Sequence, residues 1–521
     1  MNLIPTTPGS TPSYWCTWGI QNFSLGDALA SPEVWARDGF HLAMRNLDEQ
    51  RLFLDPGWAM HPFAPVRADL YIVFDVGWDV PRDTRYPDER WRLGSLEVDA
   101  ERFPSCTGTP TERLHALNAL VQAAGWRGAG LWVSPQVVGD RDGNMSADSV
   151  AEAYWRERAR WSHTAGIAYW KVDIGARSNS GAFRQMLTRV AREEAPGLWV
   201  EHGTNSGPLN DVAAPWDSPE QIVATQAHSR FATWGAIPER SLELLAIGDV
   251  FRTYDVTAQL SVATTLDRVA YLLQHGHVED GARGLLNCED EPYLGAALGC
   301  AIGVMRHPQW QDFSHLDYDP ANFRQRMDEV TRAVRWQRIA PAFGVAETSM
   351  VVAKRVLTDQ WLFERGQTWA AFIFNQTIAQ GAPAVVARGM PLPEIQADGE
   401  PPFVIASRHP NGAVAVATLP RTMNGQFITP PAHVALYVGP GDVPIGVFGH
   451  YQTLTLRLDT PLGQRRIWAQ DLAGNQAQDI TTQATNDGTQ ITLPGALLHA
   501  LGTLAATPGD RSEPGVAIAI A

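Results

Sequence analysis

Carboxylates and cations stand together where apolar segments of this sequence end. Residues 168–175 read AYWKVDIG, so that Lys171 and Asp173 are two positions apart. On a β-strand, residues with this spacing project to the same face. A nearby cation favours the ionised form of a carboxylate, and an ionised carboxylate can act as a nucleophile. A structural ion pair is the alternative, because an unpaired buried charge is costly.

Three further segments end in a similar way. Arg252 and Asp255 close the segment FRTYD, which repeats the combination of a cation and a carboxylate. Asp75 and Glu201 each follow an apolar run, and each has a glycine two positions later. A glycine there is typical of a tight turn over a site. These residues therefore extend the candidate site beyond the first pair.

The elements that must bring these residues together alternate between two patterns from residue 14 to residue 343. Short runs rich in Val, Ile, Trp and Tyr predict strands, and the longer segments between them have a helical period. Strands are predicted at 13–19, 70–77, 128–135, 167–174, 198–202, 246–253, 284–288 and 299–305, and helices at 111–124, 151–164, 181–194, 264–274 and 322–339. The pattern predicts a (β/α)8 TIM barrel, in which functional residues lie at the carboxyl ends of the strands.

After residue 343 the pattern becomes all-β. Alternation of period two appears at 350–354, 360–364 and 368–374, and helical runs almost vanish. This predicts a C-terminal antiparallel sandwich, with the Pro/Gly-rich segment 438–446 as a linker or a long turn. We expect a catalytic barrel over 1–343, a β-sandwich over 344–446, and a second small β module, or a continuation of the sandwich, over 447–521.

Composition narrows the possible partners. A formal net charge of −15 over 521 residues disfavours nucleic acid and anionic membranes, and no apolar run approaches the roughly 20 residues of a membrane span. Four scattered cysteines predict neither a disulfide scaffold nor a zinc site. The oxygen-rich segment 140–144 lacks the glycine position of an EF-hand, so no metal or cofactor is expected. The protein is expected to be cytoplasmic, or secreted or periplasmic if a signal peptide has been removed.

Four motifs occur in an order that is typical of one group of enzymes. YWCTW at 14–18 is similar to the W-C-T-W of raffinose synthases and the W-N-S-W of α-galactosidases, and FDVGW at 74–78 looks like a D-D-G-W strand end. GLWVSP at 130–135 matches G-L-W-V-x-P, and YWKVD at 169–173 matches Y-x-K-x-D. Together they resemble the α-galactosidase clan of glycoside hydrolases, families 27 and 36, including the raffinose-synthase branch.

The resemblance implies a retaining, exo-acting α-glycoside hydrolase whose substrate is an oligosaccharide or glycoside. It makes Asp173 the nucleophile, Asp255 the acid/base residue and Lys171 a donor to the ring hydroxyls. Trp15 or Trp18 would lie on the apolar face of the sugar, although two tryptophans three positions apart could equally pack in the core. The expected substrate-binding residues are Trp15, Trp18, Asp75, Trp78, Trp132, Lys171, Glu201 and Arg252.

Two departures from the clan leave alternatives open. Val76 stands where many members have a second Asp, so the sugar could be galactose, N-acetylgalactosamine or L-arabinopyranose. Asp255 follows Arg252 by three positions, where some members show four. A raffinose-synthase-like transglycosylase and a non-catalytic carbohydrate-binding barrel are the competing functions.

The expected chemistry requires two carboxyl groups with unequal proton affinities. Retaining enzymes place them about 5–5.5 Å apart, one ionised for attack at the anomeric carbon and one protonated to assist departure. Lys171 would keep Asp173 ionised, whereas an apolar wall or an anionic neighbour would keep Asp255 protonated.

Overall fold

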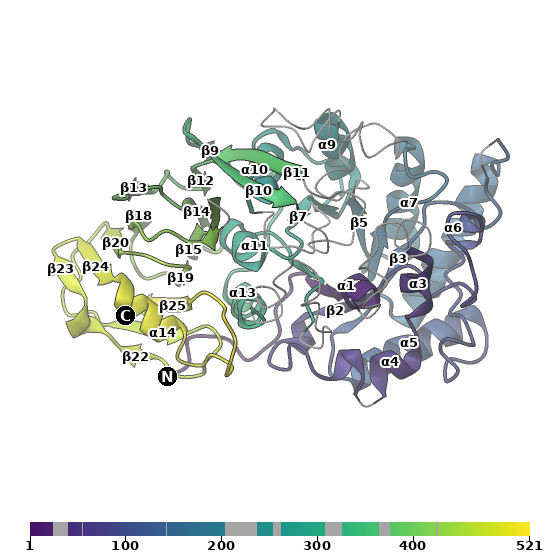
Figure 1. Ribbon diagram of the computed structural model, residues 1–521, viewed down its shortest axis with the longest axis horizontal. Helices are drawn as coiled ribbons and strands as arrows, with labels where there is room; N and C mark the ends of the chain where they lie inside the picture. Colours follow the sequence, from purple (N-terminus) through teal and green to yellow (C-terminus); the bar gives the residue numbers. More distant parts are fainter. Residues whose placement is uncertain are drawn as a thin grey trace.

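The computed structural model describes residues 1–23, 40–54, 56–141, 143–203, 237–253, 262–307, 326–363, 376–423 and 426–521. A barrel and an all-β region lie side by side, with helices α11 (Pro292–Leu298) and α13 (Asp328–Ile339) between them (Figure 1). In the described ranges, no helix combines the length and the apolar character that a membrane span requires.

Within the described residues, eight strands form one parallel sheet in the order β7-β6-β5-β4-β3-β2-β1-β8. An isolated parallel bridge between Asn287 and Ala301 joins the β7 and β8 sides, so the sheet closes. The predicted (β/α)8 barrel is confirmed. The strands are β1 (Tyr14–Cys16), β2 (Tyr71–Phe74), β3 (Gly128–Val133), β4 (Tyr169–Val172), β5 (Trp199–Gly203), β6 (Val250–Arg252), β7 (Leu285–Asn287) and β8 (Gly303–Val304).

Helices connect the strands, and their ends follow local sequence signals. A capping box between Thr109 and Glu112 begins α5 (Pro110–Ala123), and Gly166 in the left-handed conformation ends α6 (Asp148–Ala165). The other helices of the barrel are α1 (Trp18–Phe23), α3 (Phe40–Arg45), α4 (Glu49–Phe53), α7 (Gly181–Glu194), α9 (Ile237–Ile247) and α10 (Val262–His275), with short 3-10 turns η3 (Trp58–Met60), η4 (Arg67–Asp69) and η5 (Arg90–Arg92).

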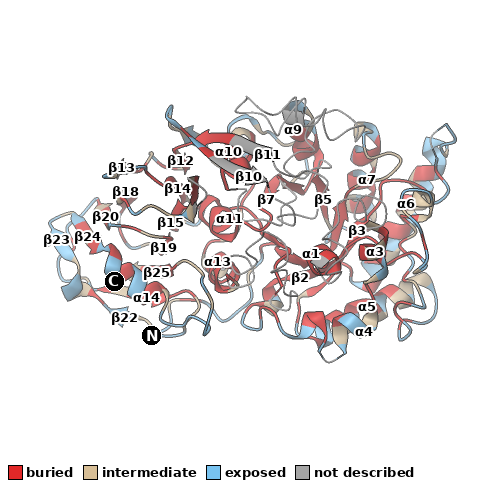
Figure 2. Ribbon diagram, viewed as in Figure 1, coloured by how far each residue is buried: buried red, intermediate tan, exposed pale blue. Residues whose placement is uncertain are grey.

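Alternation along the strands divides the barrel residues between its interior and its outer surface. On β1, Tyr14 and Cys16 project inward, where they contact Glu201 at 3.3 Å and Asp75 at 3.1 Å. Trp15 between them points outward and stacks on Trp126, with ring centroids 5.5 Å apart. Figure 2 shows the barrel strands as almost wholly buried. The interior therefore contains polar groups, and the outer layer contains the larger apolar ones.

The all-β region is one structure built from two main sheets. Their orders are β22-β21-β25-β19-β15-β14-β12-β9 and β13-β18-β20-β24-β23, and the ribbons β10-β11 and β16-β17 accompany them. The strands are β9 (Met350–Val352), β10 (Val356–Phe363), β11 (Gln376–Pro383), β12 (Val385–Arg388), β13 (Glu394–Gln396), β14 (Phe403–Arg408), β15 (Val414–Leu419), β16 (Arg421–Met423), β17 (Gln426–Ile428), β18 (His433–Gly439), β19 (Ile445–Phe448), β20 (Thr453–Leu458), β21 (Ile467–Asp471), β22 (Gln478–Asp479), β23 (Thr485–Asp487), β24 (Gln490–Pro494) and β25 (Gly515–Ile520). The 3-10 turn η7 (Thr481–Gln483) and helix α14 (Gly495–Gly502) complete it.

Both main sheets contain strands from either side of residue 447. β19 itself spans the predicted boundary, and it pairs with β15 on one side and β25 on the other. In the second sheet, β18 pairs with β20. Strands from before and after residue 447 are therefore hydrogen-bonded neighbours in both main sheets.

Buried ion pairs and hydrogen bonds join the barrel to the sandwich. Arg332 on α13 contacts Asp471 on β21 at 2.9 Å, and both side chains are almost fully buried. Arg388 on β12 donates to the carbonyl oxygens of Leu298 and Gly344 at 2.7 and 2.6 Å. These charged contacts fix the helical layer between the two regions.

We predict that Arg332→Leu lowers the free energy of unfolding by about 3–5 kcal/mol, because it leaves the Asp471 carboxylate buried without its cation. Urea denaturation followed by tryptophan fluorescence would measure the loss. The double variant Arg332→Leu/Asp471→Leu removes both charges and should lose less than the single variant. An equal or greater loss in the double variant would contradict this explanation.

Candidate active site

Asp173 lies directly after β4, at the carboxyl end of the barrel. Its carboxylate accepts a hydrogen bond from Trp132 Nε1 at 3.1 Å and lies 3.4 Å from the guanidinium of Arg252. Its backbone carbonyl accepts a hydrogen bond from Arg184 at 2.9 Å. Residues from β3 and β6 therefore hold the carboxylate, and a residue from α7 holds the backbone beside it.

The surroundings of Asp173 favour its ionised form. Burial alone would raise its pKa, but Arg252, Lys171 and the indole N–H of Trp132 together hold the pKa below its ordinary value. Its carboxylate is thus a buried anion, oriented by neighbours on other strands. Such a group can serve as a nucleophile or as an electrostatic partner for developing positive charge.

Lys171 makes its direct ion pair with Asp75. Nζ lies 2.8 Å from the Asp75 carboxylate, and the two side chains are 1% and 4% exposed. Cys16 Sγ contacts the same carboxylate at 3.1 Å and lies 3.5 Å from Nζ. Lys171 favours ionised Asp173 through space, but the cation in contact with Asp173 is Arg252. The spacing predicted the shared face of Lys171 and Asp173, but it could not predict which partner Lys171 takes.

Glu201 lies one level deeper in the barrel, because it is in register with Lys171. Its carboxylate accepts hydrogen bonds from Tyr169 at 2.8 Å, Asn287 at 2.6 Å and Tyr14 at 3.3 Å. Burial raises its pKa, although Arg252 and these donors oppose the shift. The carboxylate thus belongs to a network that links β1, β4, β5 and β7 across the barrel, and its expected contact with a sugar stays a prediction.

The four tryptophans of the expected site differ in their surroundings. Trp15 and Trp78 are fully buried, and their indole N–H groups donate to the carbonyl oxygens of Arg306 and Trp132. Trp15 therefore matches the core-packing alternative. Trp132 donates to Asp173, whereas Trp18, at 4% exposure, lies 5.1 Å from the ring of Phe40.

An aromatic row formed by Trp18, Phe40 and Tyr86 was not predicted from the sequence. The ring centroid of Phe40 lies 4.2 Å from that of Tyr86, on which it stacks, and 5.1 Å from that of Trp18. Burial raises the pKa of the Tyr86 phenol, Arg90 lowers it, and the negative charge of Asp173 raises it. Neither Phe40 nor Tyr86 belongs to a motif that indicates function.

Glu289 is a second residue that the predicted site omitted. It follows β7, is fully buried, and its carboxylate lies 3.8 Å from Nε of Arg252. The N-cap position of α11 is Glu291, two residues further along the chain. Asp255, the expected acid/base residue, lies outside the described residues, as does Tyr254 before it.

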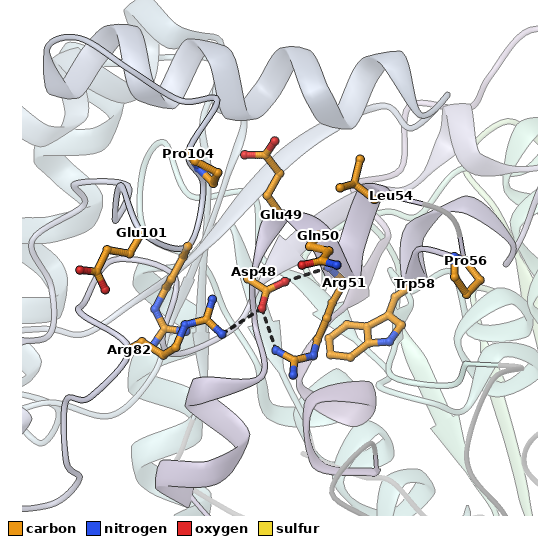
Figure 3. Close-up of a pocket in the computed structure, with 11 residues that line it drawn as sticks. Asp48, Glu49, Gln50, Arg51, Leu54, Pro56, Trp58, Arg82, Glu101 and Pro104 are labelled. Atoms are coloured by element: carbon orange, nitrogen blue, oxygen red, sulfur yellow. Dashed lines mark hydrogen bonds and ion pairs between the residues drawn. The ribbon is translucent and has the colours of Figure 1, made fainter.

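Two other groups of charged residues are separate from this constellation. Asp140, from the oxygen-rich segment, pairs with Arg177 at 2.8 Å and accepts backbone N–H groups. A cavity of about 600 Å³ adjoins α4, where Asp48 pairs with Arg51 at 2.7 Å and Arg82 at 3.2 Å (Figure 3). None of the predicted site residues within the described ranges lines that cavity.

Comparison with known proteins gives similar solved structures only. The chain matches no protein-family model and no curated protein. A family 27 β-L-arabinopyranosidase from Geobacillus stearothermophilus is 11% identical, with a TM-score of 0.39, over 98% of this chain and 96% of that chain. A putative α-N-acetylgalactosaminidase from Bacillus halodurans is 11% identical, with a TM-score of 0.39, over 100% and 99%. An α-galactosidase from Saccharomyces cerevisiae, with raffinose, is 10% identical, with a TM-score of 0.31, over 99% and 98%.

These three names correspond to the sugar specificities that the sequence motifs left open. Likeness at this level of identity and TM-score assigns neither an activity nor a substrate to this chain. The geometry around Asp173 must therefore support any functional conclusion.

We predict that Lys171→Met lowers the free energy of unfolding at pH 7 by about 3–5 kcal/mol, because it leaves the Asp75 carboxylate buried without its cation. Urea denaturation would measure the loss. The double variant Lys171→Met/Asp75→Asn should recover part of it, since no unpaired charge remains. A single variant as stable as the parent protein would contradict the buried pair.

Proposed function

We propose that the protein is a retaining α-glycoside hydrolase, α-galactosidase-like and exo-acting, with Asp173 as the nucleophile. The observation that carries the proposal is the state of Asp173: a carboxylate at the carboxyl end of β4, kept ionised by Arg252 and oriented by the Trp132 N–H. In a TIM barrel this is the end where active sites lie.

The reaction proceeds in two displacements. An Asp173 oxygen attacks the anomeric carbon and forms an ester while the bond to the leaving oxygen breaks, and Asp255 donates its proton to that oxygen. Asp255 then takes a proton from water, which attacks the same carbon and releases Asp173. The assignment of Asp255 is supported by its place in the sequence, three residues after the arginine that contacts Asp173.

The polar and aromatic groups near Asp173 support a sugar as the substrate. Lys171 and Asp75 offer a donor and an acceptor for ring hydroxyls at the level below the nucleophile. The row of Trp18, Phe40 and Tyr86 offers apolar surface for the face of the ring. A neutral sugar also suits a chain with a net charge of −15.

A transglycosylase is the second candidate, because one observation favours it. Cys16, from the motif shared with raffinose synthases, contacts both Asp75 and Lys171. Both functions would use Asp173 in the same first step, and they differ in whether water or a sugar accepts the glycosyl group. Product analysis with and without an acceptor sugar separates them.

The identity of the sugar is part of the proposal. Galactose, N-acetylgalactosamine and L-arabinopyranose are the candidates, and Val76 replaces an Asp that many clan members have. The side chain of Val76 is a hydrocarbon and is buried at 1% exposure, and it therefore offers no acceptor to a hydroxyl. Nitrophenyl α- and β-glycosides, with NMR of the first-formed anomer, would identify the sugar and test retention.

We predict that Asp173→Ala lowers kcat by about 10⁴-fold or more, because no glycosyl-enzyme can form. Azide added to Asp255→Gly should restore turnover and yield a glycosyl azide with the same anomeric configuration as the substrate, since the nucleophile is intact. Kinetics with an activated aryl glycoside and NMR of the azide product are the measurements. Near-normal turnover by Asp173→Ala would overturn the assignment of the nucleophile.

We predict that Trp132→Phe moves the acidic limb of the kcat/KM profile to higher pH by about one unit. Loss of the indole donor raises the pKa of Asp173, so the carboxylate becomes protonated at a higher pH and activity is lost sooner on acidification. Trp15→Phe removes a buried indole that does not contact Asp173 and is the matched control for the position of the limb. An unmoved limb in Trp132→Phe would mean that its N–H does not tune the nucleophile.

A further inference from the structure

Arg252 occupies a position between two carboxylates. Its Nη2 lies 3.4 Å from Asp173, and its Nε lies 3.8 Å from Glu289. The arginine and Glu289 side chains are 1% and 0% exposed, so solvent screens neither contact. The proposed nucleophile therefore shares its cation with a second buried anion.

The barrel makes room for this arginine. A Cβ on Gly203, at the end of β5, would lie 2.9 Å from Nη2 and 3.0 Å from Nε of Arg252. A larger residue at this position would therefore require the guanidinium to shift. The location of Arg252 is thus set by packing as well as by charge.

The turn after β7 holds Glu289 toward the barrel interior. Asp290 adopts a left-handed conformation with a φ of 55°, which non-glycine residues seldom take. Its backbone N–H donates to the Gly303 carbonyl at 2.8 Å, and its carboxylate accepts the Met305 N–H at 3.0 Å. Arg306 donates to its carbonyl oxygen at 2.6 Å. Several bonds to β8 and the residues after it therefore fix the turn.

The charges in the described part of the site are unequal in number. Four carboxylates, those of Asp75, Asp173, Glu201 and Glu289, stand against three cations, Lys171, Arg184 and Arg252. Glycoside cleavage develops positive charge at the sugar ring, and nearby cations disfavour that charge unless anions offset them. Glu289 is placed to offset Arg252 because its carboxylate lies 3.8 Å from Nε of the guanidinium.

We propose that Glu289 is a positioning residue for the reaction: it holds Arg252 and shares its charge, so that Asp173 keeps the basicity of a nucleophile and the site stays anionic. This inference rests on the proposed function. It adds a residue from the turn after β7 to a site predicted from β1 to β6.

The test compares Glu289→Gln, which removes the charge and keeps the shape, with Glu289→Asp, which keeps the charge. In Glu289→Gln, Asp173 interacts with a less neutralised guanidinium, so its pKa falls. The acidic limb of kcat/KM should then move to lower pH by about half a unit, and kcat should fall by about tenfold. Glu289→Asp should keep the limb within about 0.2 units of its normal position, and the exposed Glu97→Gln is the matched control.

A merely structural role predicts the opposite sign. If Glu289 only kept Arg252 from moving away, its loss would raise the pKa of Asp173 and move the limb to higher pH. A limb that does not move, or moves upward, in Glu289→Gln would overturn the proposal. An equal downward movement in Glu289→Asp would overturn it as well, because that variant retains the charge.

A stability cycle tests the contact without any substrate. The Tm of Arg252→Gln, Glu289→Gln and the double variant should show a double loss smaller than the sum of the single losses, because the two groups interact directly. Additive losses would overturn the inference even in an active enzyme. Absence of any glycosidase activity in the parent protein would instead contradict the proposed function, and the cycle would still decide whether Arg252 and Glu289 act as a pair.

Discussion

The guanidinium of Arg252 is the interaction on which the candidate site depends. It is buried beside Asp173 on one side and Glu289 on the other, and it also opposes the burial effect on the pKa of Glu201. A buried carboxylate without a cation would take up a proton and cease to be a nucleophile. One arginine on a short strand thus lowers the pKa of two carboxyl groups, Asp173 after β4 and Glu201 on β5.

Hydrogen bonds stabilise these buried charges inside the barrel, and small residues leave space for them. The Glu201 carboxylate accepts three side-chain donors, and Lys171 and Asp75 satisfy each other. Gly203 leaves space for Arg252, and a Cβ on Gly303 would lie 2.9 Å from the ring of Tyr14. Polar residues inside a barrel are thus tolerated because each has a partner and because glycines leave space for the largest of them.

Sequence patterns predicted the barrel because short apolar runs alternate with longer segments of helical period along residues 14–343. α7 occurs at the predicted bounds, 181–194, because Ser180 caps it and its apolar residues keep a helical period. The motifs led to Asp173, Trp132, Lys171 and Asp75, which lie within contact distance of one another or of Arg252. The hydrophobic period and the motifs are local signals, and the structure contains the helix and the contacts to which they led.

Partners across the barrel could not be predicted in the same way. Lys171 is two residues from Asp173 but pairs with Asp75, because the inward side chains of β2 and β4 meet inside the closed sheet. Glu289 stands in an acidic run that resembles a helix start, and the pairing of β6 with β7 places it beside Arg252. Tyr86 and Phe40 lie in segments without a motif, so their stacking is a product of the fold. Such contacts depend on register and closure, which single segments do not encode.

The sandwich has a structural part in this site through the helical layer. α11 begins three residues after Glu289 and is buried along its whole length, and Arg388 of the sandwich donates to the carbonyl oxygen of its last residue, Leu298. The turn at Asp290 is therefore held by β8 on one side and by a helix fixed to the sandwich on the other. A barrel alone would leave α11 exposed to solvent on its outer face, and the β7 turn would lose part of its support. The C-terminal region thus helps to hold the β7 side of the site, where Glu289 meets Arg252.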